Sequence, residues 1–381
     1  MNVSVATDSV EVSLLESVRR LAAQARLSAR QSDEDARYDE GLWSRVKELG
    51  LAGLCVPEAQ GGAEASISLF CKVCETLAMT DTTTSTLVHL QGNNAYLLRH
   101  APNRGAADAV LCEMAEGKTL TAYALSEPGA GSDAAHIQAT ARPHGDGYLL
   151  NGTKCFSSWA SMADVVLVFA RITSLPAREQ ISCFIVRPPQ PGFTISRKEK
   201  KMGLRAAPLC EIALQDLYVP KEDCLGEAGL FRQALASLDY SRVGIASMSV
   251  GLAQGALEHA FRYVHERKAF GQQIGEFQGV QFMLADMATQ IEAARTLTMQ
   301  AARVADARGD FGRLASMAKY FASDVAMKVT TDAVQLLGGA GYTSEHPVER
   351  MMRDAKAIQI FEGANELQRA LVYRSLRKEL L

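Results

Sequence analysis

The spacing of apolar residues predicts helices in the first part of the chain. Leu14, Val18 and Leu21 fall on one helical face, and residues 42–49 repeat the same three-to-four spacing. The connection LAGLCVPEAQGG at 51–62 is rich in residues that break helices. We therefore predict an N-terminal α-helical domain over residues 1–118.

The period changes to two in the middle of the chain. Cys210, Ile212 and Leu214 alternate with other residues in a way that is typical of a half-buried strand. Apolar runs at 165–170 and 181–186 predict two further strands. Turn signals occur at Asp146-Gly147, at Asn151-Gly152 and in the Pro-rich segment 187–192. We predict a central β-barrel-like domain over residues 119–227.

Helical periodicity then returns and continues to the end of the sequence. An apolar stripe that starts at Val280 and Leu284 continues to Val304, about seven turns of helix. Neighbouring helices are predicted at 231–267 and 314–337. Helices, then strands, then helices differ from the alternating pattern of a doubly wound sheet. The predicted fold is an α+β multidomain protein that ends in a C-terminal four-helix bundle over residues 228–381.

Composition narrows the function classes. The chain has 381 residues, 48% of them hydrophobic and 22% charged, which is typical of a globular protein and not of a disordered one. A formal net charge of −3 argues against nucleic acid or an anionic membrane as the main partner. The N-terminus lacks a secretory signal pattern, and no apolar run approaches the roughly 18 residues of a membrane span. We expect a cytoplasmic protein.

The eight cysteines are scattered among apolar residues, so we expect reduced, buried thiols without a catalytic role. Only Cys71 and Cys74 have the spacing of a metal or redox motif. No second pair or histidine cluster completes a zinc site, and no metal site is predicted.

A glycine-rich run at 126–134 formally matches the dinucleotide-binding fingerprint through Gly129, Gly131 and Ala134. Pro128 precedes the first glycine, and residues 136–141 alternate like a strand where the fingerprint requires a helix. We therefore reject a nicotinamide site. The run is either an ordinary turn or a loop whose backbone amides approach a flat or anionic ligand.

Two C-terminal features are also candidates. The cluster Gly338-Gly339-Ala340-Gly341 is a helix C-cap or a second place where a ligand approaches the backbone. Glu362 lies between apolar Phe361 and Gly363; it is either a solvated loop residue or a carboxylate whose pKa is raised by a partly apolar setting, as a proton-abstracting base requires.

Together these motifs resemble the acyl-CoA dehydrogenase flavoprotein family over nearly the whole chain. Six segments carry the resemblance in the family's order: Gly50–Gly62, Ser126–Asp133, Asn151–Lys154, Glu266–Gly271, Gln335–Tyr342 and Phe361–Gly363.

The resemblance implies FAD as the cofactor. The residues that match flavin-lining positions of the family, or stand at them, are Tyr123, Leu125, Ser126, Gly131, Ser132, Phe156, Ser157, Ser158, Ala364 and Glu366. Phe156 and Ser158 stand where the family usually has Trp and Thr, and Ala364 replaces a usual Thr. Positions that reach the FAD of a neighbouring subunit, or cradle its adenosine and pyrophosphate, are matched by Arg267, Phe270, Gln278, Gln335, Leu336, Gly338 and Gly339. A homo-oligomer, either a tetramer or a dimer, is therefore implied.

The resemblance also implies a mechanism. Glu362 matches the family's catalytic base, which removes the α-proton of an acyl thioester while a hydride leaves the β-carbon for flavin N5. Relatives that carry the base elsewhere have an acid near Tyr240 and Ser241, and neither is an acid here. Substrate contacts are implied for Ser132, Asp239, Ser241, Arg242 and Gly363, although Asp239 and Arg242 could equally form a helix-surface ion pair.

The implied activity is conversion of acyl-CoA to trans-2-enoyl-CoA, with an electron-transferring flavoprotein or oxygen as the acceptor. Ala207 and Leu209 stand where the family commonly has Ser and Thr, which leaves room for a thioester on an acyl or peptidyl carrier protein in a biosynthetic pathway. A flavin oxidase or monooxygenase on the same fold is a further alternative. A flavin-binding protein without turnover would lack a base, and Glu362 is present.

Overall fold

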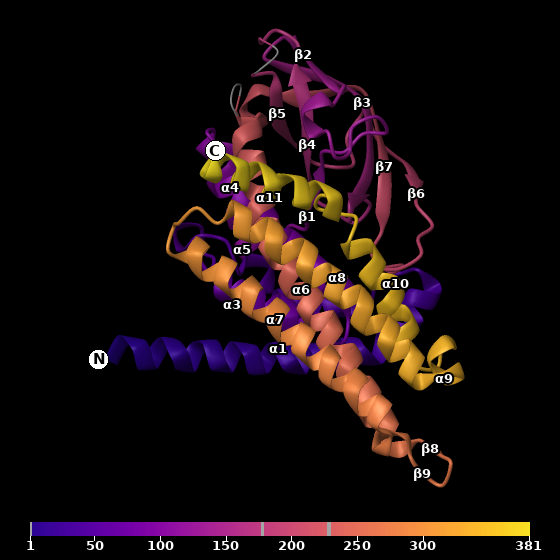
Figure 1. The fold of residues 1–381 in the computed structure, drawn as a ribbon. Coiled ribbons are helices and arrows are strands. Elements are labelled where there is room, and N and C mark those ends of the chain that lie inside the picture. The colour runs from indigo at the N-terminus through magenta and orange to yellow at the C-terminus, as the bar shows by residue number, and fades with distance from the viewer. Residues whose placement is uncertain (1, 177–178, 227–229) are drawn as a thin grey trace.

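A curled sheet lies at one end of the molecule and long helices fill the other (Figure 1). The computed structural model describes residues 2–176, 179–226 and 230–381, with side chains from residue 9 onward. The predicted boundary between residues 227 and 228 lies outside the described residues.

The first part of the chain is helical, as predicted. Asp81 caps α4 by accepting hydrogen bonds from the backbone N–H groups of Thr83 and Thr84, and the Ser66 hydroxyl caps α3 in the same way through Leu69. The helices are α1 (Asn2–Asp35), α2 (Glu40–Glu48), α3 (Ile67–Ala78), α4 (Thr82–Arg99) and α5 (Arg104–Ala115).

The middle part forms one seven-stranded sheet. Its order is β1-β4-β2-β3-β7-β6, with β5 paired to β4, and the β1–β4 and β2–β4 pairs are parallel. The predicted strand at 181–186 is β5, and on β7 Cys210, Ile212 and Leu214 are buried between half-buried residues. The strands are β1 (Thr121–Ala124), β2 (Thr140–His144), β3 (Gly147–Ser158), β4 (Val165–Ile172), β5 (Ile181–Val186), β6 (Phe193–Lys198) and β7 (Leu209–Pro220).

Two local predictions in this part were wrong. Asn151-Gly152 does not form a turn but lies inside β3, at an irregularity in its pairing with β7. The Asn151 side chain there exchanges hydrogen bonds of 2.9 Å with Asp216 on β7, a partner 65 positions away. The expected strand over 136–141 begins only at Thr140, because residues 134–136 form a short 3-10 helix.

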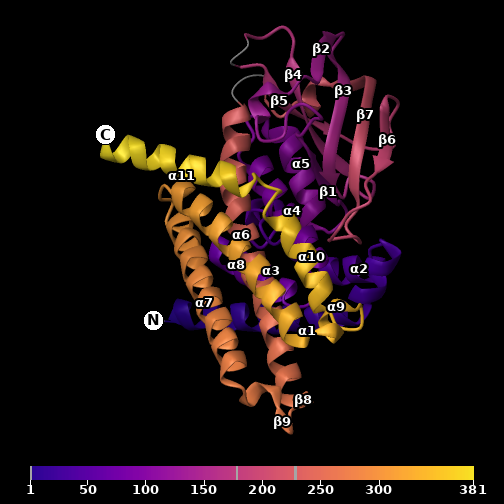
Figure 2. The same cartoon turned by 45° about the vertical axis from the view of Figure 1, so that its right-hand side comes forward.

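The last part is the predicted helical bundle. Helices α6, α7 and α8 pack side by side, α10 packs on α8 and α6, and α3 from the first part packs on α6 and α7 (Figures 1 and 2). The stripe predicted from Val280 is the buried face of α7, with Leu284, Met287 and Ile291 at 8%, 0% and 1% exposure. The elements are α6 (Leu230–Glu266), β8 (Lys268–Ala269), β9 (Gln272–Gln273), α7 (Gln278–Asp306), α8 (Gly312–Leu337), α9 (Gly339–Tyr342), α10 (Val348–Ile358) and α11 (Asn365–Leu380).

The eight cysteines form no disulfide within the described part of the chain, and seven of them are buried as expected. Cys112 is the exception, because it lies on the exposed face of α5. Within the described ranges, no helix is both long and apolar enough to cross a membrane, and no group of three or more His, Cys, Asp or Glu side chains is placed to hold a metal ion.

Candidate active site

Glu362 lies in the loop that joins α10 to α11. Its backbone φ of 54° is in the left-handed region, which is uncommon for a residue with a side chain, and Gly363 follows with a φ of 92°. The residue is half-buried, and its Oε2 atom is buried without a hydrogen-bond partner. This oxygen is therefore free to take a proton from a bound molecule.

The Glu362 carboxylate acts on buried groups from three other elements. Burial lowers the pKa of His89 on α4, and the Glu362 carboxylate opposes that shift. Burial raises the pKa of Tyr123 on β1 well above its ordinary value, and the same carboxylate adds to the shift. Lys319 on α8 is the third group, with a pKa lowered to about 8 by burial and raised in part by Glu362. The Glu362 carboxylate therefore lies within electrostatic range of α4, β1 and α8.

The glycine-rich loop lies beside the end of β3. The backbone N–H of Cys155 donates to the Ser126 carbonyl at 2.9 Å, which joins the loop to residues 156–158. Phe156 is 63% exposed, whereas Ser157 is buried and its hydroxyl has no partner. The structure thus brings Leu125 and Ser126, which follow β1 and Tyr123, beside the end of β3 that carries Ser157.

A buried ion pair holds the glycine-rich loop against β3. Lys154 Nζ lies 2.6 Å from Glu127 Oε1 and 3.1 Å from the Leu125 carbonyl oxygen. Glu127 also accepts the backbone N–H groups of Gln138 and Ala139. Burial lowers the pKa of Lys154, and the Glu127 carboxylate opposes that shift.

The residues at these loops fit a large planar cofactor. A Cβ atom added at Gly129, Gly131, Gly338 or Gly339 would meet no atom within 4 Å, so both glycine clusters face open space. Backbone amides that border open space can approach a phosphate group closely. The unpartnered Ser157 hydroxyl supplies a further polar contact. Gly338 is also the C-cap of α8, as one of the two interpretations predicted.

The expected thioester contacts lie on α6. Asp239 and Arg242 form an ion pair, but Arg242 is only 7% exposed, so this is not a surface pair. Its Nε atom is buried without a partner. Ser241 is fully buried, and its hydroxyl lies 3.1 Å from Nε2 of His89. Arg242 thus retains a donor for an incoming ligand.

The remaining predicted cofactor residues lie away from Glu362. Arg267 directly precedes β8 and Phe270 lies in the turn between β8 and β9, at the far tip of the bundle, and Gln278 begins α7 (Figure 1). Phe270 is 96% exposed, and Gln335 is exposed near the C-terminal end of α8. The chain does not bring this group together with Tyr123 and Glu362. Ala364 caps α11 beside Glu362, whereas Glu366 is exposed.

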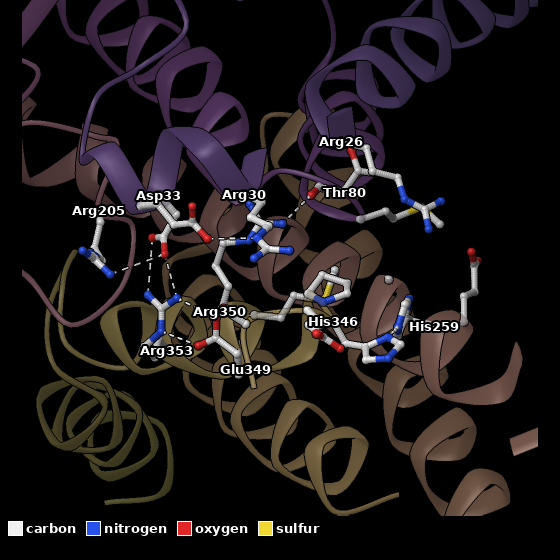
Figure 3. Close-up of a pocket in the computed structure, with 18 of the residues that line it drawn as sticks. Arg26, Arg30, Asp33, Thr80, Arg205, His259, His346, Glu349, Arg350 and Arg353 are labelled. Carbon is white, nitrogen blue, oxygen red and sulfur yellow. Dashed lines mark hydrogen bonds and ion pairs between the residues drawn. The ribbon is translucent and has the colours of Figure 1, made fainter. Parts of the chain in front are cut away.

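A separate cavity of 670 Å³ lies between α1, α6 and α10, and none of the predicted site residues lines it (Figure 3). Its lining holds six arginines and five carboxylates, so the charges nearly balance. Arg353 pairs with Asp33 and with Glu349, each at 2.7 Å. His259 lies 3.0 Å from His346, and burial followed by that neighbour lowers the pKa of His259 to about 4. The cavity is thus lined by α1 from the first part of the chain and by α6 and α10 from the last part.

Two residues near Glu362 were not predicted from the sequence. His89 belongs to no sequence motif, and only its position on the buried helix α4 brings it to the site. Lys319 had a visible signal, because it is a single charge on a helical face otherwise made of Ala315, Ala318, Ala322 and Ala326. A lysine on such a face is expected to be buried and to have a specific partner.

The chain matches known protein families over most of its length. Three family models match: acyl-CoA dehydrogenase, N-terminal domain over residues 9–118, middle domain over 122–217 and C-terminal domain over 230–377. Cyclohexane-1-carbonyl-CoA dehydrogenase of Geobacter metallireducens is 40% identical over 375 residues, which cover 97% of this chain and 98% of that protein.

Solved structures give the same result. Butyryl-CoA dehydrogenase from Megasphaera elsdenii superimposes with a TM-score of 0.93 at 35% identity, over 96% of this chain and 98% of that one. A chain from the structural study of the electron transferring flavoprotein of Acidaminococcus fermentans superimposes with a TM-score of 0.92 at 38% identity, over 96% and 97%. The chain belongs to the acyl-CoA dehydrogenase family of FAD-dependent oxidoreductases, which act on the CH–CH bond of acyl-CoA.

Proposed function

We propose that this protein oxidises the α,β carbon–carbon bond of an acyl-CoA to a trans double bond, with Glu362 as the base. The observation that carries the proposal is the Glu362 carboxylate, which acts on buried groups of three other elements and has a buried oxygen without a hydrogen-bond partner.

The α-proton of the thioester passes to Glu362, and its electron pair forms the new double bond. Bound FAD would supply the acceptor for the hydride that leaves the β-carbon. Residues of β1, the loop 126–132 and the end of β3 would hold the flavin, and the Glu362 backbone N–H would donate to the thioester carbonyl. Such a donor stabilises the charge that develops on the carbonyl oxygen, an effect worth about 3 kcal/mol.

Arg242 is the cation for the thioester carrier, because it is buried, oriented by Asp239 and still has an unpartnered Nε. A CoA thioester and a carrier-protein thioester share the pantetheine arm. We favour CoA because the relatives described above are named for CoA thioesters.

A ring stack limits the size of the acyl group. Tyr240 stacks on Phe70 and on Tyr96, with centroids 5.2 and 4.6 Å apart, and all three helices involved meet there. Tyr240 directly precedes Ser241, whose hydroxyl lies 3.1 Å from His89 Nε2, and the Glu362 carboxylate acts on the pKa of His89. Space between α4 and α6 is therefore filled by side chains, which favours a short or cyclic acyl group over a long straight chain.

Three further assignments complete the proposal. The electron acceptor is an electron-transferring flavoprotein, with oxygen as the alternative. The protein is a homo-oligomer, because the exposed Arg267, Phe270 and Gln278 would complete the cofactor site of a neighbouring copy. Its location is the cytoplasm.

Anaerobic titration tests the central claim. Flavin-loaded protein is mixed with cyclohexane-1-carbonyl-CoA, butyryl-CoA, long straight-chain acyl-CoAs and the matching carrier-protein thioesters, and flavin absorbance is followed. We expect bleaching by a short or cyclic acyl-CoA and its loss in Glu362→Gln. Bleaching by none of the thioesters, or equally fast bleaching in Glu362→Gln, would refute the proposal, and hydrogen peroxide with a non-thioester substrate would favour an oxidase.

A further inference from the structure

The loop that carries Glu362 adopts a conformation that requires support. Glu362 and Gly363 both have positive φ, and the backbone of Glu362 is strained there because it carries a side chain. Neighbouring structure must hold such a segment, and the Gly363 carbonyl is where it is held.

The Gly363 carbonyl oxygen accepts two hydrogen bonds. Lys319 Nζ donates to it at 2.9 Å and Gln368 Nε2 donates at 3.0 Å. Lys319 also donates to Asn365 Oδ1 at 2.9 Å, and Asn365 Nδ2 in turn donates to Ser323 Oγ at 2.8 Å. Helix α8 is thereby joined to both sides of the Gly363–Asn365 turn.

Burial of the Lys319 ammonium beside the Gly363–Asn365 turn is energetically unfavourable by itself. The residue is 0% exposed, and both acceptors that it contacts are neutral. Moving an unpaired cation from water into a protein interior removes its favourable hydration. The charged groups that face it are the Glu362 carboxylate from the loop, Arg242 from α6, Asp324 from α8 itself and Glu366 from α11. Of these, the Glu362 carboxylate has the largest effect on it.

We propose that Lys319 is a positioning residue for the reaction: its buried ammonium holds the Gly363 carbonyl and so fixes the strained Glu362 where it removes the α-proton. This inference rests on the proposed role of Glu362. A hydrogen bond from a charged donor is about twice as strong as one from a neutral donor, so the charge of Lys319 matters as well as its shape.

The charge makes the effect dependent on pH. Burial lowers the pKa of Lys319 to about 8, with Glu362 opposing the shift and Arg242 adding to it. As the pH rises through about 8, the ammonium loses its proton, its hydrogen bond to Gly363 weakens and its attraction to the Glu362 carboxylate disappears. The rate of flavin reduction should therefore fall above about pH 8.

The test compares Lys319→Met and Lys319→Arg in the flavin-loaded protein. Lys328→Met is the matched control, since Lys328 lies on the exposed face of the same helix and pairs with Asp332 at 2.6 Å. Anaerobic flavin reduction by cyclohexane-1-carbonyl-CoA and butyryl-CoA is timed from about pH 6 to about pH 10, and flavin content is measured from absorbance.

Lys319→Met should reduce flavin about 100-fold more slowly at neutral pH, with flavin content unchanged, because a small misplacement of a reacting group has an effect of that size. Lys319→Arg should keep part of the rate and lose the decline near pH 8, since a guanidinium stays charged. Lys328→Met should behave as the unaltered protein does.

Unchanged rates in Lys319→Met, or the same alkaline decline in Lys319→Arg, overturn the inference. If Lys319→Met does not accumulate as folded protein, the pH profile of Lys319→Arg decides alone. Glu362→Gln in the same assay separates the two proposals. Full activity of Glu362→Gln refutes the proposed base, whereas an inactive Glu362→Gln beside a fully active Lys319→Met refutes only the role of Lys319.

Discussion

The buried pair Glu127–Lys154 allows a prediction whose size follows from its surroundings. Lys154 is 0% exposed and Glu127 is 6% exposed, so removal of either partner leaves the other charge in a dry interior. Breaking such a pair costs about 3–5 kcal/mol of folding free energy. The two single substitutions should differ within that range.

In Glu127→Gln, Lys154 keeps only the Leu125 carbonyl and the neutral amide as partners. Lys154 can avoid an unpaired buried charge by losing its proton, which at pH 7 costs about 5 kcal/mol for an ordinary lysine. In Lys154→Met, Glu127 retains the N–H groups of Gln138 and Ala139. Protonation of an ordinary glutamate at pH 7 costs about 4 kcal/mol, and the two remaining donors reduce the loss to about 3 kcal/mol.

We therefore expect Glu127→Gln to destabilise the protein more than Lys154→Met does. The double variant Glu127→Gln/Lys154→Met should be more stable than the sum of the single effects, because no unpaired buried charge remains. Urea unfolding followed by circular dichroism measures the stability, and flavin release measures the loop, since the pair fixes residues 125–127.

Lys328→Met, which breaks an exposed pair, is the control and should cost less than about 0.5 kcal/mol. Single variants of the buried pair that both lie within about 1 kcal/mol of the unaltered protein would refute the reasoning. A larger loss in Lys154→Met than in Glu127→Gln would refute the ordering.

Two further predictions concern packing and pH. A Cβ at Gly251 would lie 2.1 Å from the Glu75 carbonyl oxygen, so Gly251→Ala should push α3 away from α6 and lower the stability measured by thermal unfolding by about 1–3 kcal/mol. Gly279 has open space around it, so Gly279→Ala should raise the stability by about 0.5–1 kcal/mol. Equal stability of the two variants would contradict this prediction. Burial raises the pKa of Asp354 to about 7, so the folded protein holds a proton that the unfolded chain releases. The stability should therefore fall as the pH rises from about 4 to about 7 and then level off. Asp354→Asn should lose this part of the pH dependence, and an unchanged slope of stability against pH would exclude Asp354 as its source.

The hydrophobic period predicted those helices and strands whose residues follow one uninterrupted pattern. The stripe from Val280 became α7, and the apolar run at 181–186 became β5 with the same bounds. Motif order predicted Glu362 and the glycine loops, and the comparisons confirmed the family. The roles of the individual site residues remain predictions.

Contacts between distant positions could not be predicted in this way. At Asn151-Gly152 the chain forms an irregular strand instead of the expected turn. The Asn151–Asp216 pair found there joins residues that are 65 positions apart. Lys319 and Asn365 are 46 positions apart, so no local pattern relates them. The hydrophobic period also says nothing about which buried lysine carries a charge near a carboxylate, because that depends on the folded surroundings.

Helix α8 has a consequence for how firmly the cofactor is retained. Lys319 and Gln335 lie 16 positions apart on it, which is about 24 Å along the axis. One end supports the loop of Glu362, and the other presents Gln335 and Gly338 at an exposed tip. If that tip contacts the flavin of a neighbouring copy, every chain contributes to two cofactor sites. Dilution that separates the copies would then release flavin from both sites, and flavin occupancy would rise with protein concentration.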